Sequence, residues 1–228
     1  MREAIILAGG FGTRLRSVVN DVPKPMAPVA GRPFLSYLLD DLSRQEYSHI
    51  VLATGYLHEK VEDYFGNEYQ GLALDYAREL QPLGTGGAIV NALQYCCEEC
   101  VTVLNGDTLF LVDHDRLLSI GDESRLTLVL RHVPDAGRYG AVEIDNDGHV
   151  TAFREKDPTA GNGLINGGIY RLRRSLLDGW PVGQKFSFEK EIMQPLREPF
   201  RAYLSDTYFI DIGVPEDYSR AQKELPTL

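Results

Sequence analysis

The chain has 228 residues, of which 43% are hydrophobic and 25% are charged, as in an ordinary soluble globular protein. A chain of this length can bury a large core, so it needs neither disulfides nor a structural metal to fold. Its 33 acidic and 23 basic residues give a formal net charge of −10, which argues against a general nucleic-acid or membrane binder. An anionic ligand held in a local basic pocket remains compatible with this charge.

The sequence also indicates a compartment. It contains no apolar run near the roughly 18 residues of a membrane span, and its start lacks the long apolar segment of a signal peptide. The three cysteines, Cys96, Cys97 and Cys100, lie within five residues of one another, which favours reduced thiols in a cytoplasmic protein. A zinc site would need a fourth ligand, so we interpret these cysteines as the end of a buried helix.

The first half of the chain alternates between two hydrophobic patterns. Continuous apolar runs predict strands at residues 4–7, 49–53, 72–77 and 101–104. Helical spacing predicts helices at residues 33–44, 57–65 and 86–96. Strands that alternate with helices form a parallel sheet covered on both faces, with ligands bound beyond the carboxyl ends of the strands.

The second half has a different pattern. Strands are predicted at residues 126–131, 141–144, 150–154 and 164–172, with a turn at 146–149, and helices at 188–196 and 215–224. The whole pattern predicts an α/β fold with one Rossmann-like, mixed but mostly parallel sheet and helices on both faces. We expect one domain over residues 1–228, in which about 1–110 bind one ligand and about 111–228 bind another.

A glycine-rich segment, LAGGFGTRL at residues 7–15, directly follows the first predicted strand. Its glycines let backbone N–H groups approach a phosphate closely, and a helix start behind it would add a positive dipole. The segment is not a P-loop, because Gly12 is followed by Thr13 and Arg14, nor a dinucleotide fingerprint, because Leu15 replaces the third glycine. A glycine-rich turn without a ligand remains the alternative.

A lysine between two prolines follows ten residues after Arg14. Pro23 and Pro25 restrict the backbone on either side of Lys24, which predicts a rigid extended segment presenting a cation. Alone, Lys24 could be an ordinary surface lysine. Together with the glycine-rich segment, Arg14 and Lys24 indicate a site for a polyphosphate.

These motifs resemble the signature of the sugar-1-phosphate nucleotidylyltransferases. Further motifs follow in the family's order along nearly the whole chain, and they are PLGTGGA at 82–88, NGD at 105–107, RYG at 138–140, EK at 155–156, NGGIY at 166–170 and DIG at 211–213. The stretches VPKPMAP, PLGTGGAI, FSFEKEI and FIDIGVPEDY look most like the heptose 1-phosphate guanylyltransferases of this family. Several members carry a further C-terminal domain, and we expect none here, because 228 residues are too few to hold one.

The resemblance implies a nucleotide-diphospho-sugar transferase fold and a Mg²⁺-dependent enzyme. Its expected substrates are GTP and D-glycero-α-D-manno-heptose 1-phosphate, and its products GDP-heptose and pyrophosphate. Such activated sugars feed the assembly of glycans, lipopolysaccharide or surface layers. We expect no nucleic-acid or membrane partner, and a homodimer is possible.

The reaction requires two anions to be aligned and their repulsion to be neutralised. The resemblance therefore implies three catalytic residues, with Arg14 on the departing phosphates, Lys24 on the reacting phosphates and Asp107 on Mg²⁺. Asp211 would complete the metal pair, since Mg²⁺ prefers one or two carboxylates together with phosphates and water. As alternatives, both aspartates could serve only as turn or cap residues.

The remaining contacts are implied in two groups. The expected nucleotide-binding residues are Leu7, Ala8, Gly9, Gly10, Gly12, Thr13, Arg14, Glu79, Pro82, Gly84, Thr85 and Gly86. Among them, the Glu79 carboxylate could accept from guanine N1–H and N2–H₂, although a solvated Glu79 is nearly as good an interpretation. The expected sugar-binding residues are Asn105, Gly140, Glu155, Lys156, Asn166 and Gly167, with Gly140 offering its N–H to a hydroxyl.

Three other functions remain open at this stage. The first is a uridylyl- or thymidylyltransferase acting on another sugar 1-phosphate, such as that of N-acetylmuramic acid, mannose or glucose. The second is a non-catalytic nucleotide-binding subunit, which the retention of Arg14, Lys24 and Asp107 disfavours. The third is a nicotinamide-dependent dehydrogenase, which the missing third glycine and the absence of an acidic residue at the end of the second strand disfavour.

Overall fold

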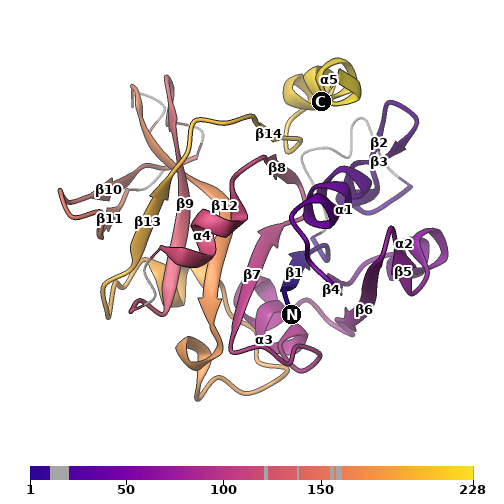
Figure 1. Cartoon of the computed structure of the whole chain (residues 1–228), viewed down its shortest axis with the longest axis horizontal. Helices are drawn as coiled ribbons and strands as arrows, with labels where there is room; N and C mark the ends of the chain where they lie inside the picture. The colour runs from indigo at the N-terminus through magenta and orange to yellow at the C-terminus, as the bar shows by residue number, and fades with distance from the viewer. Residues whose placement is uncertain (11–20, 121–122, 138, 155–156, 158–160, 228) are drawn as a thin grey trace.

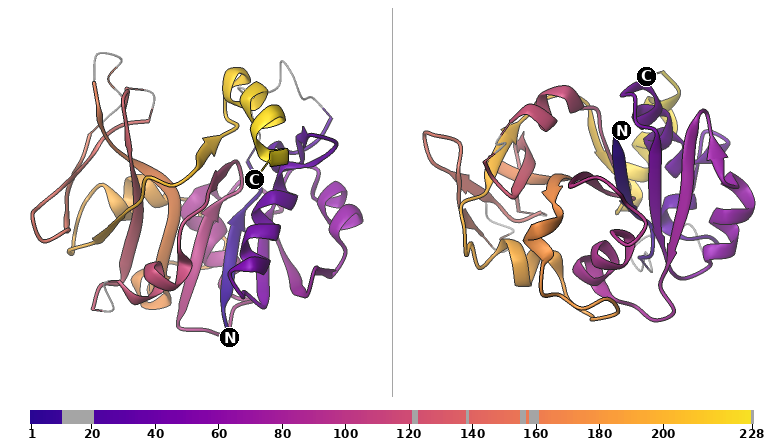
Figure 2. Two further views of the ribbon diagram at one scale, coloured as in Figure 1. Left: turned by 45° about the horizontal axis from the view of Figure 1, so that its top comes forward. Right: turned by 60° about the horizontal axis from the view of Figure 1, so that its bottom comes forward.

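The computed structural model describes residues 1–10, 21–120, 123–137, 139–154, 157 and 161–227 (Figure 1). An eight-stranded sheet runs through the molecule in the order β13-β9-β12-β7-β1-β4-β6-β5. The first half of the chain forms one side of this sheet and the second half the other, so the two halves lie side by side (Figures 1 and 2). No helix in the described part of the chain has the length and apolar character that crossing a membrane requires.

The first-half strands are mainly parallel. They are β1 (Glu3–Leu7), β4 (His49–Thr54), β5 (Glu68–Tyr69), β6 (Leu72–Arg78) and β7 (Cys100–Asn105). Strand β1 lies between β4 and β7 and is parallel to both, and β6 is parallel to β4 on its outer side. The carboxyl ends of these four strands therefore lie at one edge of the sheet.

The second-half strands make the sheet mixed. They are β9 (Leu126–Val133), β12 (Gly163–Arg173) and β13 (Arg201–Leu204). Strand β12 runs antiparallel to both β7 and β9, whereas β13 is parallel to β9. Within the described residues, four of the seven pairs of neighbouring strands are parallel, so the predicted mixed, mostly parallel sheet is confirmed.

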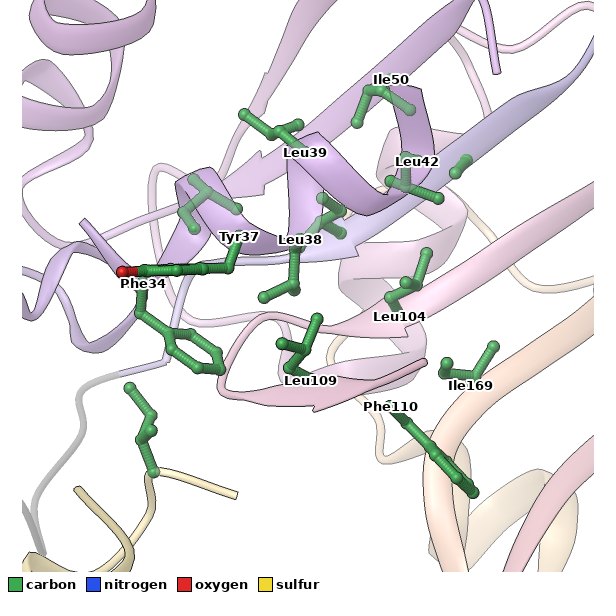
Figure 3. Packing of buried hydrophobic residues seen from close by; sticks show 14 of the residues in the cluster. Phe34, Tyr37, Leu38, Leu39, Leu42, Ile50, Leu104, Leu109, Phe110 and Ile169 are labelled. Atoms are coloured by element: carbon green, nitrogen blue, oxygen red, sulfur yellow. The ribbon is translucent and has the colours of Figure 1, made fainter. Parts of the chain in front are cut away.

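Helices cover both faces, as predicted. The helices are α1 (Phe34–Arg44), α2 (His58–Phe65), α3 (Gly84–Ala92), α4 (His114–Ser119) and α5 (Pro215–Glu224). Side chains of β1 alternate between two apolar clusters: Ile6 belongs to the one under α1, and Ile5 to the one under α3. Figure 3 shows the first cluster, where Leu38 of α1 packs towards Leu104 and Leu109.

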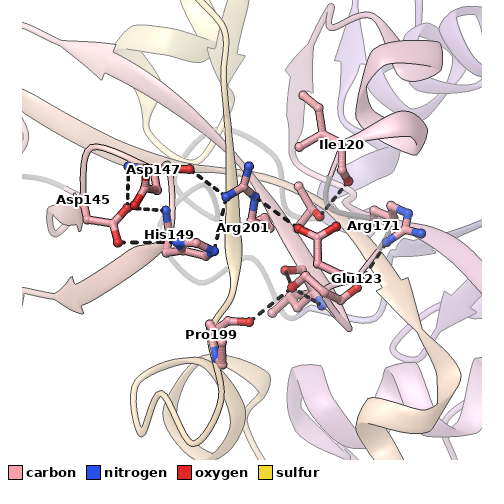
Figure 4. A network of polar contacts seen from close by, with 11 residues as sticks. Ile120, Glu123, Asp145, Asp147, His149, Arg171, Pro199 and Arg201 are labelled. Carbon is pink, nitrogen blue, oxygen red and sulfur yellow. Dashed lines mark hydrogen bonds and ion pairs between the residues drawn. The ribbon is translucent and has the colours of Figure 1, made fainter.

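Shorter elements lie outside the sheet. They are β2 (Pro28–Val29), β3 (Arg32–Pro33), β8 (Thr108–Phe110), β10 (Val142–Ile144), β11 (Val150–Phe153), β14 (Phe209–Asp211), the 3₁₀ turns η1 (Lys24–Met26), η2 (Arg174–Leu177) and η4 (Leu225–Thr227), and the π-helical turn η3 (Glu189–Met193). Strands β10 and β11 form the predicted hairpin, with Gly148 at φ 81° in its turn. Arg201 of β13 donates to the carbonyl of Asp147 in that turn, as Figure 4 shows.

Two predicted helices differ from those observed. The helix expected at 86–96 is α3, which begins two residues earlier at Gly84 and ends at Ala92, because tighter hydrogen bonds such as Tyr95 N–H to the Ala92 carbonyl follow it. The cysteines therefore lie beyond the helix: Cys96 is buried, Cys97 is exposed and Cys100 begins β7. The helical segment expected at 188–196 contains the π-helical turn η3.

Candidate active site

The predicted site residues converge on the carboxyl edge of the parallel strands. Gly9 follows β1, Gly55 follows β4, Glu79 follows β6 and Asp107 follows β7. The Glu79 N–H donates to the carbonyl of Thr54 at 2.8 Å, which continues the sheet pairing beyond β6. Parallel strands carry these residues to one edge although they lie far apart in sequence.

The glycine-rich segment begins in close contact with its neighbours. A Cβ on Gly9 would lie 2.5 Å from Glu79 Oε1, and a Cβ on Gly55 would lie 3.2 Å from the Gly9 carbonyl oxygen. A side chain at Gly9 would displace the Glu79 carboxylate, and one at Gly55 would press on the backbone of Gly9. Gly10 is exposed, and no atom of the described residues lies within 4 Å of its Cβ position. The predicted contacts of Gly12, Thr13 and Arg14 lie outside the described residues.

The first two residues of this segment anchor it to the sheet. The Leu7 carbonyl accepts from the Gly106 N–H at 3.1 Å, and the Ala8 N–H donates to the Ala53 carbonyl at 2.8 Å. The predicted nucleotide contact of Ala8 therefore cannot use its N–H, which is bonded within the protein. Leu7 and Ala8 set the position at which the segment leaves β1.

A lysine and two aspartates form a compact polar cluster at the same edge. Lys24 Nζ lies 2.5 Å from Asp107 Oδ2 and 3.9 Å from Asp211 Oδ1. Lys24 begins the 3₁₀ turn η1, so the predicted extended segment is wrong at this residue, although Pro23 before it is extended. The side chain of Lys24 is only 14% exposed, so its ammonium group contacts the carboxylates more than it contacts solvent.

A two-stranded ribbon brings the aspartates together. Strand β8, directly after Asp107, pairs antiparallel with β14, and Asp211 lies opposite Thr108. The Ile212 N–H donates to the Asp107 carbonyl at 3.0 Å, which fixes the end of the ribbon. Gly213 leaves the necessary room, since a Cβ there would lie 2.9 Å from the Lys24 ammonium nitrogen.

The cluster is short of positive charge. Burial raises the pKa of Asp211, and the nearby negative charge of Asp107 raises it further, while Lys24 and the Gly213 N–H act in the opposite direction. Two carboxylates that share one ammonium group favour the approach of another cation. Among the described residues no group of three or more His, Cys, Asp or Glu side chains could hold a metal ion. Two carboxylates nevertheless suit Mg²⁺, which usually completes its shell with phosphates and water.

Glu79 is held in place and is not simply solvated. Its Oε2 accepts from the Leu83 N–H at 2.8 Å, and its side chain lies beside Gly9. Burial raises the pKa of this carboxyl group, whereas the Leu83 hydrogen bond lowers it. The carboxylate therefore has a fixed direction next to the glycine-rich segment.

The glycine loop at the start of α3 packs against the segment 184–189. The Gly86 N–H donates to the Phe186 carbonyl at 3.1 Å, and a Cβ on Gly86 would collide with the Phe186 ring at 2.1 Å. The protein itself uses this N–H, so the base contact predicted for Gly86 stays a prediction for its other backbone atoms. Gly84 is exposed at φ 71°, and Pro82 before it is also exposed.

On the sugar side, two predictions require correction. The Gly140 N–H donates to the Ala136 carbonyl at 3.1 Å, so it does not offer this group to a sugar hydroxyl. Gly167 is buried beneath Phe110, whose ring would lie 2.6 Å from a Cβ at that position. Gly167 thus provides space for packing and does not line an open site.

The two asparagines lie near the bend in β12. The Asn166 amide donates to the Tyr170 hydroxyl at 2.7 Å, and its oxygen accepts from the Gly168 N–H at 3.0 Å. The pairing of β12 with β9 shifts register between Asn166 and Tyr170. Asn105 ends β7, and its Nδ2 would lie 2.7 Å from a Cβ on Gly168. The predicted contacts of Glu155 and Lys156 lie outside the described residues.

Sequence reasoning missed the role of three glycines that matter because they lack a side chain. Gly55, Gly106 and Gly213 each allow two backbone segments to approach closely, and only their place just after a strand could have indicated this. Glu189 was also missed. It lies in the FSFEKEI stretch, which the resemblance had singled out without a role for any side chain.

Comparison with known proteins defines the class. The sequence model of a family described as nucleotidyl transferase matches residues 3–227, and the chain belongs to this family. The protein is therefore a nucleotidyltransferase, which excludes the dehydrogenase alternative.

Particular relatives are similar along nearly the whole chain. D-glycero-α-D-manno-heptose 1-phosphate guanylyltransferase from Aneurinibacillus thermoaerophilus is 47% identical over 227 residues, covering 98% of both chains. The enzyme with the same name from Campylobacter jejuni is 43% identical, covering 95% of this chain and 96% of its own. The structure of HddC from Yersinia pseudotuberculosis in complex with GMP-PN has a TM-score of 0.89 at 39% identity, covering 99% of this chain and 100% of its own.

Proposed function

We propose that this enzyme transfers the guanylyl group of GTP to D-glycero-α-D-manno-heptose 1-phosphate, giving GDP-heptose and pyrophosphate. Two guanylyltransferases that act on this sugar phosphate are 47% and 43% identical to the chain over nearly its full length. The observation that carries the chemistry is the cluster of Lys24, Asp107 and Asp211 beside the glycine-rich segment. It combines a cation for phosphates with carboxylates for a metal.

The proposed reaction is an in-line displacement at the α-phosphorus of GTP. An oxygen of the sugar phosphate forms the new P–O bond, and the bond to the bridging oxygen of pyrophosphate breaks. Lys24 offsets the repulsion between the two phosphate groups and holds them close, which is the main task of a protein in such a transfer. Arg14, outside the described residues, would bind the departing phosphates.

Asp107 and Asp211 are the proposed Mg²⁺ ligands. When bound there, Mg²⁺ would neutralise charge on the phosphate oxygens and orient them for displacement. The raised pKa of Asp211 supports this assignment, because it reflects the burial of this carboxylate and the nearby charge of Asp107, which one lysine does not fully offset. Lys24 lies between the two carboxylates and would have to release at least one of them when the metal and the nucleotide bind.

Recognition of guanine is assigned to Glu79 with the loop at the start of α3. A carboxylate can accept from both N1–H and N2–H₂ of guanine, and neither adenine nor uracil presents that pair of donors. Glu79 has a suitable fixed direction because Leu83 holds its Oε2. Gly9, Gly10, Gly84 and Thr85 would provide further nucleotide contacts, and Gly12 and Thr13 remain predictions.

The heptose phosphate is assigned to the second half, about residues 111–228, together with Asn105. Asn105, Asn166, Glu155 and Lys156 stay the proposed sugar contacts, with Lys156 on the phosphate. A homodimer and a cytoplasmic location also stay predictions. A product of this kind would serve the assembly of glycans, lipopolysaccharide or surface layers.

The direct test measures pyrophosphate release from GTP, UTP, dTTP and ATP, each paired with heptose 1-phosphate, mannose 1-phosphate, glucose 1-phosphate and N-acetylmuramic acid 1-phosphate. We expect the highest kcat/KM with GTP and the heptose phosphate. Faster release with UTP or dTTP would replace the proposed function by the uridylyl- or thymidylyltransferase alternative. No release with any pair would favour a non-catalytic subunit.

A further inference from the structure

We propose that Glu189 is a positioning residue for the nucleotide, held by the second half of the chain against the first. It lies in η3, next to the loop of residues 82–86 at the start of α3. The inference rests on the proposed function, because that function assigns this loop and Glu79 to the guanine base. It adds that Glu189, which does not belong to the predicted nucleotide contacts, fixes the shape of the loop.

The first observation is the hydrogen bonding of Thr85. Its hydroxyl group donates to Glu189 Oε2 at 2.6 Å and accepts from the Phe188 N–H at 2.9 Å. The Ser187 hydroxyl donates to the same carboxylate oxygen at 2.9 Å. One carboxylate oxygen therefore joins the start of α3 to the segment before η3 through two hydroxyl groups, and it sets the direction of the Thr85 side chain.

The second observation is backbone contact between the same two segments. The Phe186 N–H donates to the Leu83 carbonyl at 2.9 Å, and the Gly86 N–H donates back to the Phe186 carbonyl at 3.1 Å. The fit is tight, since a Cβ on Gly84 would lie 2.5 Å from the Phe186 carbonyl oxygen. Trp180 stacks on the ring of Phe186, with ring centroids 3.8 Å apart. The segment that carries Glu189 therefore has a defined position against the loop.

The third observation links this contact to the base-recognition residue. Leu83 accepts from Phe186 through its carbonyl and donates through its N–H to Glu79 Oε2 at 2.8 Å. Thr85 bonds to Glu189, and Leu83, two residues earlier in the same loop, bonds to Glu79. The loop backbone between them therefore joins the two carboxylates. A change at Glu189 that releases Thr85 would loosen the residue that directs the Glu79 carboxylate, which touches the nucleotide in the proposed function.

A neighbouring glutamate provides a matched control. Glu191 is half-buried like Glu189 and lies in the same turn. It also accepts a hydrogen bond from Ser187, whose N–H donates to Glu191 Oε2 at 2.9 Å. The hydrogen bond to Thr85, in contrast, is made by Glu189. A general loss of order in the turn should therefore follow from changes at either residue, whereas an effect through Thr85 should follow only from changes at Glu189.

The experiment compares Glu189→Met, Glu189→Gln and Glu191→Met in the full-length protein. Methionine keeps the length of the side chain but removes the acceptor, so Glu189→Met should raise the KM and the Kd for GTP about tenfold, the loss expected for a hydrogen bond to a charged group. The kcat and the KM for the sugar phosphate should change by less than about twofold, because the groups that align the phosphates lie elsewhere. Glu189→Gln keeps an oxygen acceptor and should restore most of the affinity, and Glu191→Met should bind GTP as the unchanged protein does.

A double-mutant cycle with Thr85→Val tests whether the two residues act together. Valine has nearly the shape of threonine without its hydroxyl, so Thr85→Val alone should also weaken GTP binding. The pair Thr85→Val and Glu189→Met should cost little more than either change alone, because both remove the same contact. Thr85→Ser, which keeps the hydroxyl group, should retain the affinity.

Calorimetric measurement of the GTP Kd separates this inference from the proposed function, since it needs no sugar phosphate. If the unchanged protein binds GTP but makes no GDP-heptose, the proposed acceptor is wrong and the Kd comparison still tests Glu189. An unchanged Kd in Glu189→Met would overturn the inference. An equal loss in Glu191→Met, or a parallel loss of kcat and of affinity for both substrates with a lowered Tm, would also overturn it by showing a purely structural role.

Discussion

At the scale of single residues, Lys24 lies where a divalent cation would also be stable. Its ammonium nitrogen is 2.5 Å from Asp107 and 3.9 Å from Asp211, so the lysine partly neutralises the carboxylate pair that we assign to Mg²⁺. The same group is proposed to bind the reacting phosphates. Lys24 therefore has two sets of anionic partners, the carboxylates of the free protein and the phosphates that the substrates would bring.

Replacing Lys24 should separate these two roles. We expect Lys24→Met to lower kcat by about 10²–10³-fold, because a positioned cation at the reacting phosphates is lost. In the absence of nucleotide, the variant should bind Mn²⁺ at least as tightly as the unchanged protein, because the competing ammonium group is gone. Enzyme assays and electron paramagnetic resonance of Mn²⁺ measure the two effects.

The exposed Lys223 on α5 offers a control for this experiment. Lys223→Met removes the same charge from the whole protein and should leave turnover and metal binding unchanged. Weaker Mn²⁺ binding in Lys24→Met but not in Lys223→Met would show that Lys24 supports the metal and does not compete with it.

A buried histidine makes stability depend on pH. His114 is fully buried, its Nδ1 is hydrogen-bonded to the Tyr47 hydroxyl at 2.8 Å, and its Nε2 has no hydrogen-bond partner among the described residues. Burial lowers the pKa of His114 to about 4, and the positive charge of Arg2 contributes. The unfolded chain, with the ordinary pKa of 6.5, therefore binds more protons than the folded protein between these two values.

The free energy of unfolding should consequently fall as the pH falls from about 6.5 towards about 4. The loss from this residue can approach about 3 kcal/mol, from 1.36 kcal/mol for each pH unit. Urea denaturation at pH 7 and pH 5 measures it. His114→Gln should flatten this dependence, whereas His132→Gln, at an exposed position, should not. Equal slopes in the unchanged protein and in His114→Gln would refute the assignment.

At the scale of secondary structure, the junction between β1 and β7 sets the relative position of the glycine-rich segment and the aspartates. Gly106 donates its N–H to the Leu7 carbonyl, and a Cβ at Gly106 would lie 2.5 Å from that oxygen and 3.1 Å from Pro25. Both obstacles are poorly mobile, one being backbone of the central strand and the other a proline ring. A methyl group there must separate the two strand ends.

We expect Gly106→Ala to destabilise the protein by about 1–3 kcal/mol, the usual cost of overpacking, and to lower kcat more than it raises either KM. The reason is that Asp107 and Lys24 next to the junction would shift together. Thermal unfolding and steady-state kinetics measure the two effects. Gly161→Ala is the control, because no atom in the described part of the chain lies within 4 Å of its Cβ position. Normal stability and kinetics in Gly106→Ala would show that the junction has room to adjust.

The sequence predicts elements that are long and buried on both faces better than short ones. Strand β1 is a continuous apolar run and helix α1 has clear helical periodicity, and α5 was predicted with its observed bounds because Pro215 marks its start. Strands β8 and β14 have three residues each, too few for a periodic pattern, so their pairing was not predicted. The motifs predicted Asp107 and Asp211 individually as metal ligands. Their shared contact with Lys24 depends on the pairing of β8 with β14, which was not predicted.

The same limit explains the corrected site residues. Whether the N–H of a glycine is open to a ligand depends on distant segments that the local sequence does not reveal. The Gly86 N–H is taken by Phe186 and the Gly140 N–H by Ala136, and Gly167 lies beneath Phe110. Motif order therefore identified the class and the catalytic edge, whereas the hydrogen-bonding state of each glycine required the tertiary structure.

At the scale of the whole molecule, the two halves share their core. The apolar cluster under α3 contains Ile5 and Val103 from the first half together with Leu128 and Leu172 from the second. Strand β12 pairs directly with β7, so the sheet continues without a break across the expected boundary near residue 110. This continuity favours one cooperative folding unit, as predicted for a single domain.

Urea unfolding followed by two probes tests this prediction. Trp180 is the single tryptophan of the sequence and stacks on Phe186, so its fluorescence reports on the second half, whereas far-ultraviolet circular dichroism reports on all elements. We expect coincident transitions with one midpoint. A fluorescence transition clearly earlier than the dichroism transition would show that the second half unfolds as a separate unit.

The β8–β14 ribbon also has a consequence for protein synthesis. While the nascent chain emerges from the ribosome, the segment with Lys24 and Asp107 is translated long before Asp211, which arrives with β14. A partly synthesised chain can thus contain the parts proposed to hold a triphosphate but only one carboxylate of the proposed metal pair. Nucleotide turnover would begin only after the final strand had been translated and had paired with β8, so catalytic competence would coincide with completion of the fold.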